Sequence, residues 1–194
     1  MATVVKPGTR ALGIAESFSG DEGDPSTLCG VVTRASRVTD GFCFGSCTIG
    51  GTDATDAMCD LVAQLGREDV QYVFVAGLAL AWYDLVDLEA LHAAVDRPVC
   101  SITFEASSGG LEAGLREAFS GPSLDERLAT YERQPPRRAL DVGDETVFVR
   151  SLGLPESEAN EVVRSFTPEG GRPEPLRVAR LAARAADQWR SDRR

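Results

Sequence analysis

Lysine and histidine are almost absent from this sequence. Among 194 residues, Lys6 is the only lysine and His92 the only histidine, and 30 acids against 20 lysines and arginines give a formal net charge of −10. Because no nucleophile motif surrounds the single histidine, we do not expect a histidine-based catalytic triad. An acidic, lysine-poor surface is typical of a halophilic protein in a salt-rich cytoplasm. At molar salt the Debye length is only about 3 Å, so local arginines matter more for nucleic-acid binding than the net charge.

Long apolar runs and paired cysteine motifs are also missing. No stretch approaches the roughly 18 apolar residues of a membrane span. Residues 1–10 lack the apolar block of a signal peptide, so we expect a cytoplasmic protein. The five cysteines contain no C-x-x-C pair, which argues against a zinc site and predicts reduced, mostly buried thiols. Cys43 and Cys47 share one strand face by the period of two, which indicates packing only.

The chain contains enough hydrophobic residues, 43%, for one full-sized core, and we predict a single domain over residues 1–194. Its periodicity predicts three strands, a helix, a strand, a helix and a strand. Their ranges are 10–17, 28–34, 37–48, 53–65, 70–75, 85–95 and 98–104. Further helices are expected at 111–119, 122–133, 156–165 and 173–189, with a short hairpin at 139–142 and 146–150.

This order predicts an α/β fold with a ribonuclease-H-like mixed sheet. Three consecutive strands with short links form an antiparallel meander, and two later strands arrive through crossover helices and therefore lie parallel. The hairpin and the last helices complete the chain. In such a fold, acids from the first strand, the first helix and the fourth strand meet at one edge of the sheet.

The stretch from Gly50 to Asp56 joins the third strand to the first helix. Gly50 and Gly51 allow a sharp reversal and a close backbone approach. Asp53 and Asp56 are three residues apart on one side of the first helical turn, where a carboxylate pair can hold a divalent cation. A capping role for Thr52 or Asp53 is the competing interpretation.

A second group of candidates follows the fourth strand. Asp84 lies where open parallel sheets host ligands, and Trp82 and Tyr83 beside it could stack on an extruded base. Asp87 is a candidate acid or a cap of the next helix. Glu105 ends the fifth strand on the same side, either as a further carboxylate of the site or as a solvated loop residue.

Arginine is concentrated in the last helix. Arg177, Arg180 and Arg184 fall on one helical face by the three-and-four rule, which forms a basic stripe suited to phosphate contact. Salt bridges to neighbouring acids are the alternative role for this stripe.

Several segments taken together resemble a known family. They are LGIAESF at 12–18, GTDATD at 51–56, VFVAG at 73–77, YDLVD at 83–87, RPV at 97–99 and RPEPLRVA at 172–179, the last being the most specific. Over residues 10–186 the chain resembles the archaeal endonuclease dU family, a distant relative of endonuclease V. The resemblance implies a ribonuclease-H-like core, a requirement for Mg²⁺ or Mn²⁺, and cleavage of DNA at deoxyuridine.

The sequence departs from the family pattern at two positions. Relatives tend to carry an aspartate where Ala15 stands, and endonuclease V has a metal-binding aspartate where Ala76 stands. Alanine cannot ligate a metal. Glu16 is the substitute ligand that the resemblance leaves. Its side chain points to the opposite strand face from residue 15, so it would need a bulge or an early strand end to act as a ligand.

Three functions follow from these observations. The first is a metal-dependent endonuclease on deaminated DNA, with Asp53 and Glu16 as metal ligands and with Asp56 and Asp84 in support. In it, Trp82 or Tyr83 would pack the lesion and the terminal arginines would hold phosphates. The second is a catalytically degenerate module of the same fold that binds nucleic acid or a partner. The third is a small-molecule or partner-binding domain that does not bind nucleic acid.

Overall fold

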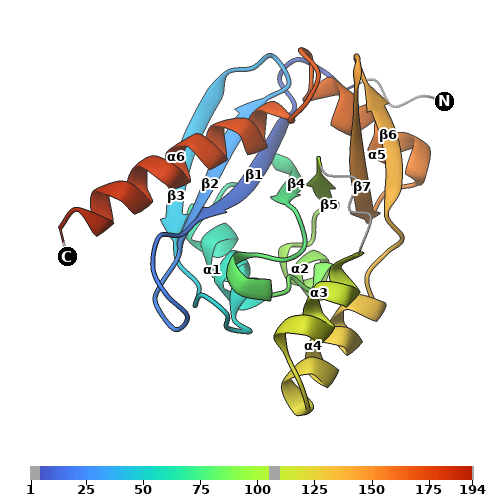
Figure 1. Cartoon of the computed structure of the whole chain (residues 1–194). Helices are drawn as coiled ribbons and strands as arrows, with labels where there is room; N and C mark the ends of the chain where they lie inside the picture. The colour runs from blue at the N-terminus through green and yellow to red at the C-terminus, as the bar shows by residue number, and fades with distance from the viewer. Residues whose placement is uncertain (1–4, 105–109, 194) are drawn as a thin grey trace.

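Seven strands form one mixed sheet in the order β3-β2-β1-β4-β5-β7-β6 (Figure 1). The computed structural model describes residues 5–104 and 110–193. The strands are β1 (Arg10–Ser17), β2 (Thr27–Arg34), β3 (Thr39–Gly45), β4 (Val70–Ala76), β5 (Val99–Thr103), β6 (Arg138–Val142) and β7 (Glu145–Leu152). β1 to β3 pair antiparallel, and β4 and β5 lie parallel to β1. The predicted ribonuclease-H-like mixed sheet is confirmed.

Helices cover both faces and one end of this sheet. They are α1 (Ala54–Leu65), α2 (Leu88–Val95), α3 (Gly110–Ala118), α4 (Pro122–Glu132), α5 (Glu156–Ser165) and α6 (Glu174–Ser191), with a short 3-10 turn η1 (Ala81–Tyr83) before α2. α1 and α2 pack on one face, and α5 and α6 pack on the other. α6 crosses β1 and β2, and its C-terminal end extends past the strands in this view (Figure 1).

Successive side chains of β1 point to opposite faces of the sheet and so contribute to the core on both sides. Leu12 and Ile14 point toward α1, whereas Ala15 points toward α6. Gly13 allows α6 to approach closely, because a Cβ atom at this position would lie 2.4 Å from the carbonyl carbon of Pro175. The amino end of α6 therefore rests directly on the middle of β1.

The C-terminal hairpin is part of the main sheet. β7 pairs antiparallel with β5, and β6 pairs with β7 at the edge. The sequence indicated a hairpin but not where it docks, because that pairing depends on contacts between distant residues.

Two predicted ranges were too long. β3 begins at Thr39 and ends at Gly45, and a register shift near Asp40 interrupts its pairing with β2. α2 begins at Leu88, because Val86 turns back to donate a backbone hydrogen bond to Leu78. Within the described residues, no helix combines the length and hydrophobicity that crossing a membrane requires.

Candidate metal centre

Asp53 is held at the start of α1 by the loop that precedes it. The backbone N–H of Thr48 donates to Oδ1 of Asp53 at 2.9 Å, and the Thr48 hydroxyl donates to Oδ2 at 3.0 Å. Asp53 occupies the N-cap position of α1, but its side chain makes no capping hydrogen bond to the helix. Burial opposes ionisation of Asp53, but the hydrogen bonds from Thr48, together with contributions from Asp84 and from its own backbone, lower the pKa of this carboxyl.

The two glycines before Asp53 behave as the sequence predicted. Gly50 has a φ of 73°, in the left-handed region, and its N–H donates to the carbonyl of Ala81 in η1. A Cβ atom on Gly51 would lie 2.9 Å from Oδ1 of Asp53. This loop can therefore place Asp53 next to the turn after β4.

Asp84 is fully buried, with 0% of its surface exposed. Neither of its carboxylate oxygens has a hydrogen-bond partner of acceptable geometry in the described part of the chain. Burial raises the pKa of Asp84 to about 7. The nearby backbone N–H of Ala54 opposes this rise, and the carboxylates of Asp53 and Glu16 add to it. A cation is one partner that would satisfy such a group.

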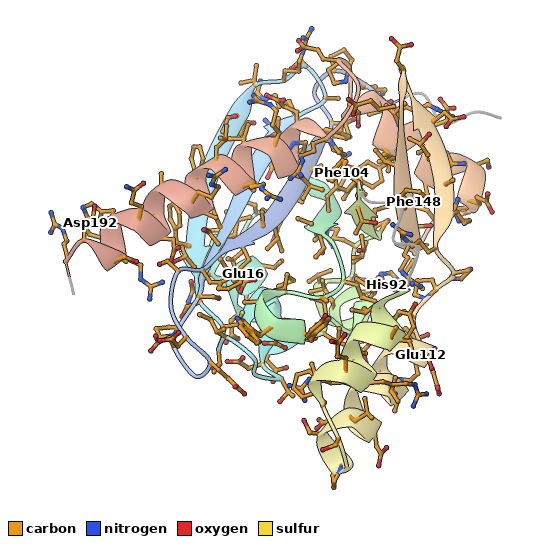
Figure 2. All side chains as sticks on the ribbon, viewed as in Figure 1. Glu16, His92, Phe104, Glu112, Phe148 and Asp192 are labelled. Carbon is orange, nitrogen blue, oxygen red and sulfur yellow. The ribbon has the colours of Figure 1, made fainter. Side chains whose placement is uncertain are left out.

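Cys47 brings sulfur to this group. One ligand atom each from Cys47, Asp53 and Asp84 lies within 4.8 Å of the others. The Cys47 thiol donates to Oε1 of Glu16 at 3.4 Å, and the N–H of Ala81 donates to Oε2 of Glu16 at 2.8 Å. Figure 2 labels Glu16 at the lower end of β1, beside the turn that carries η1. Acids from β1, α1 and the turn after β4 thus gather at one edge of the sheet.

This group of side chains lies on the α1 face of the sheet. Glu16 pairs regularly with Leu28, one residue before β1 ends at Ser17, so it lies near Asp53 and Asp84 through its place at the strand end and not through a bulge. Ala15 and Ala76 lie on the α6 side, where they line a cavity of about 170 Å³ with Arg180. Glu16 lines the same cavity while its carboxylate contacts Cys47, so this cavity and the carboxylate group adjoin each other at Glu16.

The structure separates other predicted acids from this group. Asp56 is exposed on α1 and is not among the described residues that could share the ion. Asp87 caps α2 by accepting from the N–H groups of Glu89 and Ala90, which confirms its capping interpretation. Glu105 lies outside the described residues.

Trp82 and Tyr83 adjoin the centre, but they differ in exposure and in the residues they contact. Both have positive φ values, 55° and 61°, which is uncommon for residues other than glycine. The Trp82 side chain is 57% exposed. The Tyr83 ring packs edge-on against Phe119 beside α3, with ring centroids 6.1 Å apart. Trp82 is thus the aromatic side chain of the two that is open to a ligand.

Arg127 on α4 is a buried residue that the sequence analysis missed. Its guanidinium donates to the carbonyls of Gly50 and Gly51 at 2.9 Å each and to that of Tyr83 at 3.2 Å. It therefore joins the loop before Asp53 to the turn before Asp84. The available signal was its spacing, because Arg127 falls on the apolar face of α4 with Leu124 and Leu128.

The three arginines of the basic stripe, Arg177, Arg180 and Arg184, are exposed on α6, and one of them is paired. Arg177 forms a two-pronged ion pair with Glu174, both contacts at 2.7 Å. Among the described residues no ion pair is formed by Arg180 or Arg184. The salt-bridge interpretation therefore holds for Arg177, and two arginines remain for an external anion.

The sequence matches the endonuclease dU family over residues 7–187. The chain belongs to the endonuclease dU family. A UPF0215 protein of Pyrobaculum aerophilum is 33% identical over 179 residues, which is 92% of this chain and 94% of that protein. A UPF0215 protein of Thermococcus kodakarensis is 31% identical and aligns over 100% of both chains. These endonuclease dU relatives are archaeal.

Solved structures relate the endonuclease dU fold to endonuclease V. A protein of unknown function from Archaeoglobus fulgidus superposes with a TM-score of 0.78 at 26% identity, covering 92% of this chain and 98% of that one. Human endonuclease V superposes with a TM-score of 0.64 at 13% identity, covering 94% and 86%. Endonuclease V of Ciona intestinalis, solved with inosine-containing DNA, gives a TM-score of 0.59 at 11% identity, covering 93% and 86%. This endonuclease dU chain therefore has the ribonuclease-H-like fold of endonuclease V.

Proposed function

We propose that the protein is a metal-dependent endonuclease that cleaves DNA containing deoxyuridine. The observation that carries the proposal is the buried carboxylate of Asp84, which lacks a hydrogen-bond partner and lies beside Asp53, Cys47 and Glu16. Paired carboxylates at the edge of such a sheet suit the binding of a divalent cation. The family match and the likeness to endonuclease V support the nuclease class.

The chain's own residues would fix a cation in place. Asp53 is held by Thr48, Asp84 by its buried setting, and Glu16 by the N–H of Ala81. When bound, a divalent cation supplies Lewis-acid activation of water and stabilises the leaving oxygen of a phosphodiester. Mg²⁺ and Mn²⁺ are the ions that the family resemblance implies.

Trp82, Arg180 and Arg184 are suited to hold DNA beside this centre. Trp82 presents an exposed ring next to Asp84, where a base turned out of the duplex could stack. Arg180 lines the cavity next to Glu16, and Arg184 follows one turn along the same helix face. In a chain of net charge −10, these unpaired arginines provide a local attraction for phosphate.

A nicking assay tests the proposal. Purified protein is incubated with a duplex that contains one deoxyuridine, at high KCl, with Mg²⁺, Mn²⁺ or Zn²⁺. We expect nicking that falls at least 100-fold in Asp53→Ala, because that variant removes a ligand of the cation. Asp60→Ala is the matched control, since Asp60 is an exposed acid on the same helix. No nicking with any ion, or equal nicking in Asp53→Ala, would contradict the proposal.

A module that binds DNA without cutting it is the second candidate. Ala15 and Ala76 favour it, because they line a cavity with Arg180 where relatives carry acids. Binding of the uracil duplex without nicking, weakened in Arg180→Gln, would support this candidate and exclude the first. Absence of binding would leave a small-molecule or partner-binding domain.

A further inference from the structure

We propose that Cys47 is a metal ligand and that the centre prefers a thiophilic divalent cation, such as Zn²⁺ or Co²⁺, over Mg²⁺. This inference deepens the proposed function and rests on it insofar as both place a cation at Asp53 and Asp84. It names a ligand that local sequence spacing does not identify, because Cys43 and Cys47 are separated by three residues but no second cysteine or histidine pair accompanies them.

Cys47 differs from the other cysteines in its surroundings. Its sulfur contacts a carboxylate oxygen of Glu16 at 3.4 Å and lies within 4.8 Å of ligand atoms of Asp53 and Asp84. Cys29 and Cys43 instead donate to the backbone carbonyl of Gly30. Among the residues that the structure describes, no other group of three metal-ligating side chains gathers this closely.

The position of Cys47 is fixed from both sides. The backbone N–H of Ser26 donates to the carbonyl of Cys47 at 2.8 Å, and the Ser26 hydroxyl lies 3.2 Å from the sulfur. The residue is only 3% exposed. The thiol is therefore held against the carboxylates and is buried from solvent.

Asp84 supplies an independent observation that a ligand belongs here. Asp187 is the other buried aspartate in the described chain, and the hydroxyls of Ser17 and Thr27 donate to it. Asp84 has no such donor to either oxygen. Burial without a partner destabilises a carboxylate, and a cation shared with Cys47 and Asp53 would remove that penalty.

The donor set decides which cation fits. Mg²⁺ prefers six oxygen ligands in octahedral geometry and keeps several waters. A thiolate with two or three carboxylates suits Zn²⁺ or Co²⁺, which accept sulfur and oxygen in a four-coordinate site. The thiol proton passes to solvent when the Cys47 sulfur takes the metal, so binding releases a proton.

The absorption spectrum of bound Co²⁺ reports whether a thiolate ligates the metal, and it requires no activity assay. The full-length protein is titrated with Co²⁺, and a thiolate-to-cobalt charge-transfer band is followed in the near ultraviolet. We expect one equivalent to bind with this band, Zn²⁺ to displace it, and Mg²⁺ in 100-fold excess to leave it in place. Cys47→Ser should lose the band and bind Co²⁺ at least ten times more weakly.

Cys59→Ser is the matched control, because Cys59 is half-buried on α1 near Asp56 and Asp60 and lies outside the centre. It should keep the band. Asp53→Asn should weaken Co²⁺ binding with the thiol still present, which covers the case in which Cys47→Ser does not fold. A wild-type spectrum without the band, a band that survives in Cys47→Ser, or displacement by Mg²⁺ would overturn the inference.

The outcomes separate this inference from the proposed function. A cobalt–thiolate band in a protein that never nicks DNA would retain the metal site and reject the nuclease. Nicking supported best by Mg²⁺ and unchanged in Cys47→Ser would retain the nuclease and reject the thiol ligand.

Discussion

Asp84 combines complete burial with carboxylate oxygens that have no hydrogen-bond partner of acceptable geometry among the described residues, and this sets the chemistry of the centre. A proton or a cation can neutralise it. With a pKa raised to about 7 by burial, the two compete near neutral pH. Asp53, whose pKa is lowered by Thr48, keeps its charge over the same range and supplies the attraction for the cation.

The raised pKa of Asp84 predicts how the stability of metal-free protein depends on pH. The ordinary value is 3.8 and the folded value about 7, so the folded state keeps a proton that the unfolded state has lost. Stability contributed by this group is therefore complete below pH ~4 and falls as pH rises toward ~7, by up to about 4 kcal/mol. Asp84→Asn, which cannot ionise, should be more stable than the natural protein at pH 8 in EDTA by urea unfolding.

Asp60→Asn controls for the loss of one negative charge from an acidic chain. Because Asp60 is exposed, its substitution should change stability by less than ~0.5 kcal/mol. Equal stability of Asp84→Asn and the natural protein at pH 8 would show that Asp84 is not held as the structure indicates.

Arg127 predicts a large loss of stability from one buried side chain. Arg127→Met leaves the carbonyls of Gly50, Gly51 and Tyr83 without their donors, and each buried unpaired group destabilises by about 1–3 kcal/mol. We expect a loss of about 3 kcal/mol in urea unfolding and weaker Co²⁺ binding. Arg116→Met, which removes an exposed pair with Glu112, should cost less than ~1 kcal/mol. A similar effect of both variants would contradict the role assigned to Arg127.

At the scale of elements, local periodicity predicts helices and the mixed sheet well. α5 has the predicted bounds of 156–165, because its apolar residues repeat at helical spacing and a proline precedes it. The predicted ranges of β3 and α2 were too long because contacts with distant residues set their limits. Thr48, predicted as the last residue of the third strand, forms only an isolated bridge with Pro25. Val86, predicted inside the helix, donates a backbone hydrogen bond to Leu78.

The contact between β1 and α6 gives a prediction at this scale. In Gly13→Ala the new methyl group would meet the carbonyl carbon and oxygen of Pro175 at 2.4 and 2.5 Å and its Cβ at 2.6 Å, and these atoms cannot rotate away. We expect α6 to shift and stability to fall by about 2–3 kcal/mol, measured by thermal unfolding. Gly41→Ala is the control, because the nearest atom there is the flexible end of Arg67 at 3.7 Å. A neutral Gly13→Ala would contradict the packing.

The candidate centre was predictable only in part. Glu16, Asp53 and Asp84 could be named because the fold order brings their elements to one edge. Asp56 was named from helical spacing alone, which fixes its neighbours but not whether the turn faces solvent. Cys47 and Arg127 were missed because their partners are far away in sequence: Cys47 contacts Glu16 across 31 positions and Arg127 contacts Gly50 across 77.

At the scale of the whole molecule, the net charge of −10 predicts that salt stabilises the protein. Screening reduces repulsion among carboxylates that folding brings together. Raising KCl from 0.1 to 2 M should increase stability by about 1–2 kcal/mol, which raises Tm by roughly 2–8 °C in calorimetry. A Tm that stays constant or falls would contradict this reading of the surface.

At the same scale, two features of the molecule adjoin each other. Cys47, Asp53 and Asp84 form one group of side chains, and Glu16 contacts Cys47 while it also lines the cavity formed with Ala15, Ala76 and Arg180. The cation site that we propose and the cavity beside α6 therefore meet at Glu16.

The location of a bound cation tests this account most directly. Crystals of the full-length protein grown with Co²⁺ would reveal the ion by its anomalous scattering. The account predicts a single strong peak on the α1 face, in contact with Asp53, Asp84 and the sulfur of Cys47. A peak in the cavity beside Ala15, Ala76 and Arg180, or no peak at either place, would contradict it.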